Sequence, residues 1–184
     1  RFWAVPGISR VLIGAAFPYD PAATAETLGY TPDQWVSPQV AVALAHVAYA
    51  RALAAPRPGG HVGVGVTGSV ATLRVHRGPH RAWVAVVSDE WTDVVCLDLA
   101  KRSGASARRA DDASVVDLAV RLTCAAASGT PVTRASRERV TVLDDGDVLG
   151  HVTLFTHPLF RADGTRGASA PRDVVFFPGT FDPL

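Results

Sequence analysis

The segment Val62–Ser69 has the sequence VGVGVTGS and decides the fold of this chain. Its alternating valines predict a strand over residues 61–66, because short β-branched runs bounded by turn residues are typical of strands. Gly63 and Gly65 carry no side chain, which predicts the close approach of another backbone. We expect residues 67–69 to form a tight turn. Open α/β sheets bind ligands at the carboxyl ends of strands, so this turn is a candidate site, although a plain strand and turn explains the residues equally well.

Apolar runs on either side of this segment predict three further strands, at residues 11–17, 82–87 and 94–99. The last two are separated by a short polar loop, which predicts a hairpin. Ser37 and Pro38 predict the start of a helix that ends near Ala55, since Ser is a good N-cap and Pro suits the first helical position.

A second helix is expected to be capped by Asp111 or Asp112 and to end at Gly129. Its apolar face follows helical spacing and consists of Val115, Leu118, Ala119, Leu122 and Ala126. This alternation of strands and helices over residues 1–128 predicts an α/β domain with a parallel or mixed sheet covered by helices.

The chain changes character after this domain. Residues 140–155 predict a β-hairpin and residues 161–172 a linker, so we assign residues 129–172 to a hairpin and linker. Residues 173–177 predict a new buried strand, the first element of a further domain over residues 173–184.

Composition narrows the functional classes. The chain has 184 residues and a formal net charge of +1, which argues against a nucleic-acid or membrane-surface footprint. We see no signal peptide and no membrane span, and expect a cytoplasmic protein. Cys96 and Cys124 fit no disulfide or metal framework, so both are expected to be buried small hydrophobes.

Six short segments carry a family resemblance. They are VPGISR at residues 5–10, FPY at 17–19 with LG at 28–29, VSPQVA at 36–41, GVTG at 65–68, the segment 78–86, and Arg108-Arg109 ahead of Asp111. In order and spacing they resemble motifs of the CinA C-terminal domain, the nicotinamide-nucleotide amidohydrolase family. The resemblance implies a three-layer α/β/α sandwich with a mixed sheet, a homodimer, and hydrolysis of the amide of nicotinamide mononucleotide without a metal or cofactor.

The same resemblance implies residue roles. Thr67 would be an active-site hydroxyl, and Tyr19 would contact the ring or the phosphate. The implied substrate and phosphate ligands are Arg109, Arg108, Gly68, Ser69 and Arg81. We expect Tyr19, Thr67 and one arginine of the pair to line a shared anion-binding site, since Arg suits bidentate phosphate contact.

Three departures from the family pattern put hydrolysis in doubt. The family's Ser-bearing turn would precede Arg1, its Lys falls at Thr24, and its Gly-rich stretch after the Thr is replaced by residues 71–74. The arginines at positions 74, 77 and 81, with His80, form a basic cluster that either replaces the missing cation or is a solvated loop. The alternatives are therefore a deamidase-type domain, a degenerate nucleotide-binding or regulatory domain, and a structural or dimerising domain.

The histidines give weaker signals. His76 and His80 are four residues apart, but they lie in a loop with Pro and Gly and lack a carboxylate pattern, so we do not expect a metal site. His46 is expected to be structural.

Residues 174–184 (VVFFPGTFDPL) resemble the start of the nucleotidyltransferase motif FPGTFDPLHxGH. A buried strand followed by a glycine turn can cradle phosphates. The resemblance implies a phosphate loop of Gly179, Thr180, Phe181 and Asp182, in the first strand of a Rossmann-like transferase that uses ATP or CTP with Mg. The motif's histidines do not follow in this sequence. We expect a fusion of the two activities in pyridine-nucleotide metabolism.

Overall fold

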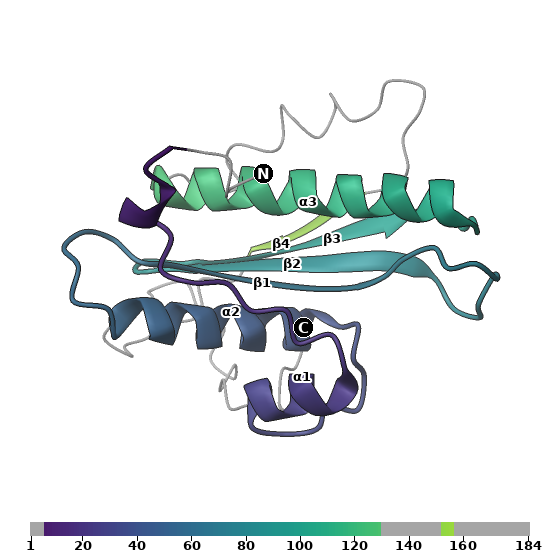
Figure 1. Ribbon diagram of the computed structural model, residues 1–184, viewed down its shortest axis with the longest axis horizontal. Coiled ribbons are helices and arrows are strands. Elements are labelled where there is room, and N and C mark those ends of the chain that lie inside the picture. The colour runs from purple at the N-terminus through teal and green to yellow at the C-terminus, as the bar shows by residue number, and fades with distance from the viewer. Residues whose placement is uncertain (1–5, 130–151, 157–184) are drawn as a thin grey trace.

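The structure is a computed structural model that describes residues 6–129 and 152–156. Its elements, in chain order, are the short 3-10 helix Ile8–Arg10, α1 (Pro21–Leu28), α2 (Pro38–Leu53), β1 (Val62–Ser69), β2 (His80–Ser88), β3 (Thr92–Leu99), α3 (Ala105–Ala127) and β4 (Val152–Thr156) (Figure 1). This order confirms the mixed α/β class.

The strands form one sheet in the order β1-β2-β3-β4, and every pairing among the described strands is antiparallel. The expected parallel or mixed sheet is not what these strands form. The short connections between β1 and β2 and between β2 and β3 favour antiparallel pairing, because a parallel pair needs a long crossover. β4 follows α3 in the chain and also pairs antiparallel with β3. At the β2–β3 turn, Ser88 N donates to Trp91 O at 2.9 Å.

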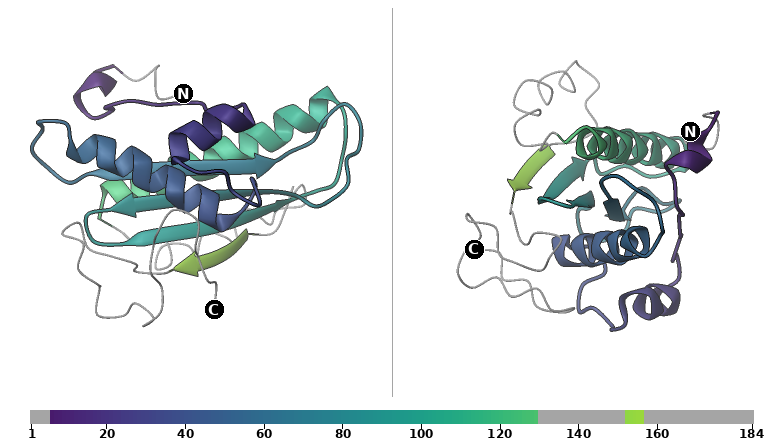
Figure 2. Two further views of the ribbon diagram at one scale, coloured as in Figure 1. Left: turned by 90° about the horizontal axis from the view of Figure 1, so that it is seen from below. Right: turned by 90° about the vertical axis from the view of Figure 1, so that its left-hand side faces the viewer.

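Helices cover both faces of the sheet (Figures 1 and 2). One core joins α2 to Trp83, Ala85 and Val87 of β2. The other joins Leu118 and Leu122 of α3 to the alternate residues of the same strand. Side chains alternate between faces along a strand, so β2 is apolar on both faces from Ala82 to Val87.

The glycines of β1 allow α2 to approach closely. A Cβ on Gly65 would overlap the Ala41 carbonyl oxygen, and one on Gly63 would overlap that of Ala45. The sequence-based expectation of a close backbone approach is confirmed. The Ser37 cap is also confirmed, since its Oγ accepts from Val40 N at 3.3 Å.

The expected strand over residues 11–17 is wrong. The segment is extended but joins no sheet among the described residues, and it runs past the β1 edge (Figures 1 and 2). Val11 is 74% exposed and Phe17 86% exposed. Apolar character alone cannot make a strand without a hydrogen-bonding partner.

Two element boundaries also differ from expectation. Residues 67–69 are not a turn but continue β1, opposite residues 81–83 of β2. Helix α3 begins at Ala105, after Gly104 with φ 94°, so Asp111 lies inside the helix and is fully buried instead of capping it. The expected apolar face is confirmed at Leu118, Leu122 and Ala126.

The remaining expectations have mixed outcomes. Cys96 is buried as expected, but Cys124 is exposed, so that prediction was wrong. Within the expected hairpin of residues 140–155, β4 is described and pairs with β3. The expected linker and the strand of residues 173–177 lie outside the described residues.

Candidate functional site

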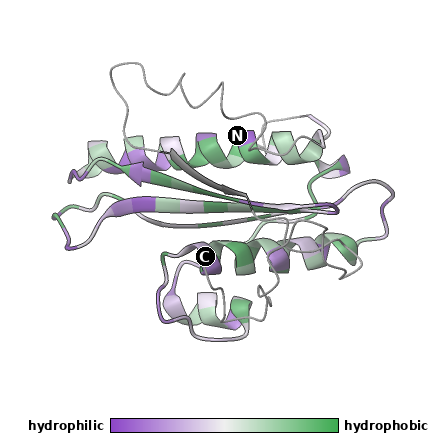
Figure 3. Ribbon diagram, turned by 180° about the vertical axis from the view of Figure 1, so that it is seen from behind, coloured by the Kyte–Doolittle hydropathy of each residue, from purple (hydrophilic) through white to green (hydrophobic). Residues whose placement is uncertain are grey.

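Polar residues collect at one end of the sheet, where β1 ends and β2 begins (Figure 3). The carboxylate of Asp111, on α3, is fully buried there. It accepts from the backbone N of Ala71 at 2.8 Å and from Nη2 of Arg102 at 3.3 Å. A buried charge needs such partners, so Asp111 fixes the chain that leaves β1 against the first turns of α3.

His80 lies beside this carboxylate and is 2% exposed. Neither ring nitrogen has a hydrogen-bond partner among the described residues. Burial, more than the nearby His76 and Lys101, lowers the pKa of His80, while Asp111 acts in the opposite direction. His80 is therefore held as a neutral imidazole. A buried polar group without a partner is uncommon and marks this end of the sheet as a candidate site.

A hydroxyl and an imidazole meet at the same place. Oγ of Ser69 lies 3.3 Å from Nε2 of His76, and the His76 ring is 4.4 Å from that of His80. Nδ1 of His76 lies 2.9 Å from the Arg77 carbonyl oxygen, and Nε2 lies 3.4 Å from that of Val70. Ser69 and His76 are both half-buried, so solvent reaches them.

Sequence reasoning placed Ser69 among the phosphate ligands but assigned His76 no role. The six residues between them, 70–75, form an irregular connection, and no periodic spacing predicts a contact across such a loop. The spacing of His76 and His80, four residues apart, is the one sequence signal for this contact, and the two rings lie against each other at a tilt of 31°.

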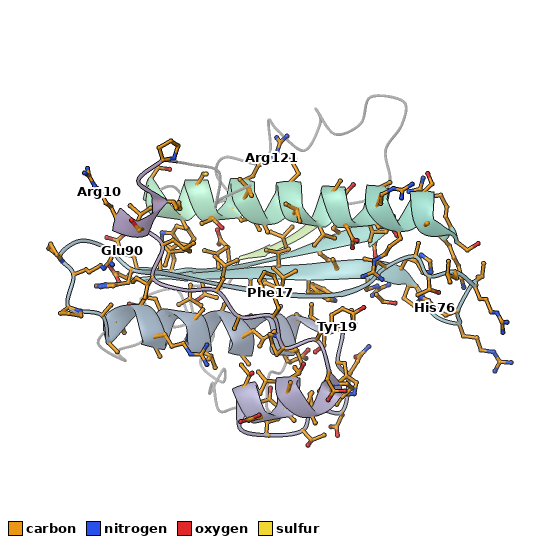
Figure 4. The ribbon with its side chains drawn as sticks, in the orientation of Figure 1. Arg10, Phe17, Tyr19, His76, Glu90 and Arg121 are labelled. Atoms are coloured by element: carbon orange, nitrogen blue, oxygen red, sulfur yellow. The ribbon has the colours of Figure 1, made fainter. Side chains whose placement is uncertain are left out.

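A second group of residues lies at the start of α3. Tyr19 lies close to Arg108, and this proximity is the largest cause of a raised Arg108 pKa. Nε of Arg108 also donates to both carboxylate oxygens of Asp112, each at 3.1 Å. Tyr19 is 86% exposed (Figure 4). Arg109 is exposed, and no hydrogen bond or ion pair joins it to the part of the chain that the structure describes.

Thr67 lies on the other side of the sheet. Its hydroxyl donates to the Trp35 carbonyl oxygen at 2.7 Å, just ahead of α2. The neighbouring odd positions Gly63 and Gly65 face α2, so Thr67 shares that face. The structure thus brings Tyr19 to Arg108 and places Thr67 across the sheet from the arginine pair.

The other expected ligands lie along the end of the sheet. Gly68 lies against Ala82: a Cβ added to Gly68 would be 3.2 Å from the Cβ of Ala82. Nε of Arg81 is 3.5 Å from Oδ1 of Asp98, which is close enough for an ion pair but not aligned for a hydrogen bond.

Thr24, at the family's Lys position, is buried and donates to the Pro18 carbonyl oxygen at 2.7 Å, which holds the start of α1.

The expected phosphate loop at Gly179, Thr180, Phe181 and Asp182 lies outside the described residues. Within residues 6–129 and 152–156, no group of three or more His, Cys, Asp or Glu side chains is placed to hold a metal ion. Among the described helices, none combines the length and apolar character that crossing a bilayer requires.

Comparisons with protein-family models, with curated proteins and with solved structures find no match to this chain.

Proposed function

We propose that this domain binds a mononucleotide, with Tyr19 and Arg108 as its principal ligands. The contact between these two side chains carries the proposal, because it places an exposed aromatic ring beside a guanidinium that comes from a different element. An aromatic ring can stack on a base, and a guanidinium can bind a phosphate.

The start of α3 supports a phosphate at this place. The N-cap residue of α3 is Gly104, which has no side chain. The first backbone N–H groups of the helix therefore have no side-chain oxygen to cap them. Helix N-termini attract anions through these groups and through the helix dipole. Arg109, exposed and next to Arg108, adds a second cation.

The family resemblance supports a finer version of the proposal. Under it, the domain is a CinA-like three-layer sandwich of the nicotinamide-nucleotide deamidase type, in a fusion with a nucleotidyltransferase. Helices on both faces of the sheet agree with such a sandwich. The substrate would be nicotinamide mononucleotide, and the homodimer remains a prediction.

The contacts favour the alternative in which the domain binds the nucleotide and Thr67 does not hydrolyse it. The hydroxyl of Thr67 already donates its proton to the Trp35 carbonyl oxygen, and Thr24 supplies no cation. Activation of a hydroxyl needs a base or a nearby positive charge. The Tyr19–Arg108 pair would then serve as a nucleotide sensor for the transferase.

The test compares two matched arginines on α3. Arg108 pairs with Asp112, and Arg121 pairs in the same i,i+4 manner with Asp117. Calorimetric titration with nicotinamide mononucleotide should show Arg108→Gln weakening binding by about tenfold or more, since charged hydrogen bonds contribute about 1.5–3 kcal/mol. Arg121→Gln should bind like the wild type.

Absence of binding by the wild-type chain would overturn the proposal. Ammonia release from nicotinamide mononucleotide that Thr67→Ala abolishes would establish the deamidase, whereas tight binding without ammonia would establish the binding domain.

A further inference from the structure

The contact between Ser69 and His76 has the parts of a nucleophile and its base. Activated serine nucleophiles are recognised by a hydroxyl within hydrogen-bond reach of a histidine nitrogen whose other nitrogen is oriented by a third group. Here Oγ of Ser69 is 3.3 Å from Nε2, and the Arg77 carbonyl oxygen is 2.9 Å from Nδ1. Catalytic contacts of this kind are often long in the absence of substrate.

The surroundings select the tautomer that a base needs. A carbonyl oxygen only accepts, and carbonyl oxygens lie 2.9 Å from Nδ1 (Arg77) and 3.4 Å from Nε2 (Val70). The shorter contact favours the proton on Nδ1, which leaves Nε2 with a lone pair toward Ser69. Once Nε2 takes a proton, the Val70 carbonyl oxygen at 3.4 Å can accept from it. Both N–H groups of the imidazolium are then satisfied.

Two buried polar groups, His80 and Asp111, lie at this end of the sheet. His80 stacks against His76, and its burial keeps it neutral, so it adds no repelling charge. Asp111 is fully buried behind it and is held by Ala71 and Arg102. Lys101 also acts on His80, and it is exposed.

From this geometry we propose that Ser69 and His76 are a catalytic dyad that hydrolyses small carboxylic esters or amides through an acyl-serine. Oγ of Ser69 bonds to the carbonyl carbon while its proton passes to Nε2. The bond to the leaving group breaks, and the leaving alcohol or amine takes the proton from Nε2. Water, deprotonated by the same nitrogen, then hydrolyses the acyl-serine to the carboxylic acid and restores the hydroxyl.

The inference stands apart from mononucleotide binding at Tyr19 and Arg108, because no residue is shared between the two. The Arg108→Gln variant therefore separates them: it should lose affinity for nicotinamide mononucleotide and keep the reactivity of Ser69.

The experiment treats the full chain with a small fluorophosphonate and locates the adduct by peptide mass spectrometry. Hydrolysis of p-nitrophenyl acetate is followed in parallel. We expect an adduct on Ser69 and an initial burst of about one p-nitrophenolate per chain, as covalent catalysis predicts. Ser69→Ala should remove both, and His76→Gln should slow both by about 100-fold or more, the usual contribution of a general base.

Matched controls are Ser114→Ala, on α3, and His61→Gln, which lies ahead of β1; both should react like the wild type. Circular dichroism melting curves establish that each variant is folded. The wild-type adduct tests the proposal without any substitution. Absence of an adduct on Ser69, or labelling that is unchanged in His76→Gln, would overturn it.

Discussion

The backbone carbonyl of Ala41 occupies the space that a side chain on Gly65 would need. Helix α2 therefore rests directly on the backbone of β1. We predict that Gly65→Ala destabilises the domain by at least about 1–3 kcal/mol, the usual cost of overpacking, because the obstacle is backbone and cannot rotate away. Urea denaturation followed by tryptophan fluorescence measures the change in the free energy of unfolding.

Gly14→Ala is the matched control for that experiment. No atom lies within 4 Å of a Cβ built at Gly14, and its backbone is outside the left-handed region. We expect the free energy of unfolding of Gly14→Ala to lie within about 0.5 kcal/mol of the wild-type value, as for other surface substitutions. Equal stability of the two variants would contradict the close approach of α2 to β1.

Much of the fold around this contact follows from local sequence. Ser37 and Pro38 mark the start of α2, and the valine and glycine alternation marks β1, because caps and strand periodicity act over a few residues. The apolar face of α3 is predictable for the same reason. Residues 11–17 have equal apolar character, but forming a strand depends on a partner that a local pattern does not reveal.

The candidate site was less predictable. Asp111 resembles a helix cap in sequence, yet α3 begins at Ala105 because Gly104 adopts a positive φ that the composition does not specify. The Ser69–His76 contact depends on the path of the whole β1–β2 connection. Such contacts arise from tertiary structure, and only their residue types can be read from the sequence.

The buried His80 should make the domain sensitive to acid. Burial lowers its pKa in the folded state, so below the unfolded pKa, about 6.5, the unfolded chain binds the proton more readily. Stability is therefore present at neutral pH and is lost as the pH falls through that value. His80→Leu should reduce the loss between pH 7.5 and pH 5.5, measured by urea denaturation at each pH.

Part of the acid sensitivity should persist in that variant, since burial also lowers the pKa of His46. Gly14→Ala, which removes no titratable group, serves as the control and should leave the slope of stability against pH as in the wild type. A slope in His80→Leu identical to that of the wild type would show that the pKa of His80 is the same in the folded and unfolded states, which would contradict the effect of burial.

The two cysteines should differ sharply in reactivity. Burial, with a smaller contribution from Asp98, raises the pKa of Cys96 to about 11, and its side chain is buried. Cys124 is exposed on α3. Because the thiolate is the reactive form, Ellman's reagent at pH 8 should modify about one thiol per folded chain and two after denaturation. The thiol that reacts rapidly in the folded chain should be Cys124, so the rapid reaction should be lost in Cys124→Ser. Two thiols that react equally fast in the folded wild type would contradict the burial of Cys96.

The last prediction concerns the buried carboxylate of Asp111. It accepts from Ala71 N and from the Arg102 guanidinium, so Asp111→Ala would leave a buried N–H without its partner. Breaking a buried ion pair costs about 3–5 kcal/mol, and the partial exposure of Arg102, 38% for its side chain, places the expected loss at the lower end. Asp111→Asn keeps an oxygen for Ala71 and should cost less. The free energy of unfolding, measured at pH 7.5, should therefore be higher for Asp111→Asn than for Asp111→Ala. Equal losses in the two variants would show that the charge, and not the hydrogen bond to Ala71, holds the β1–β2 connection against α3.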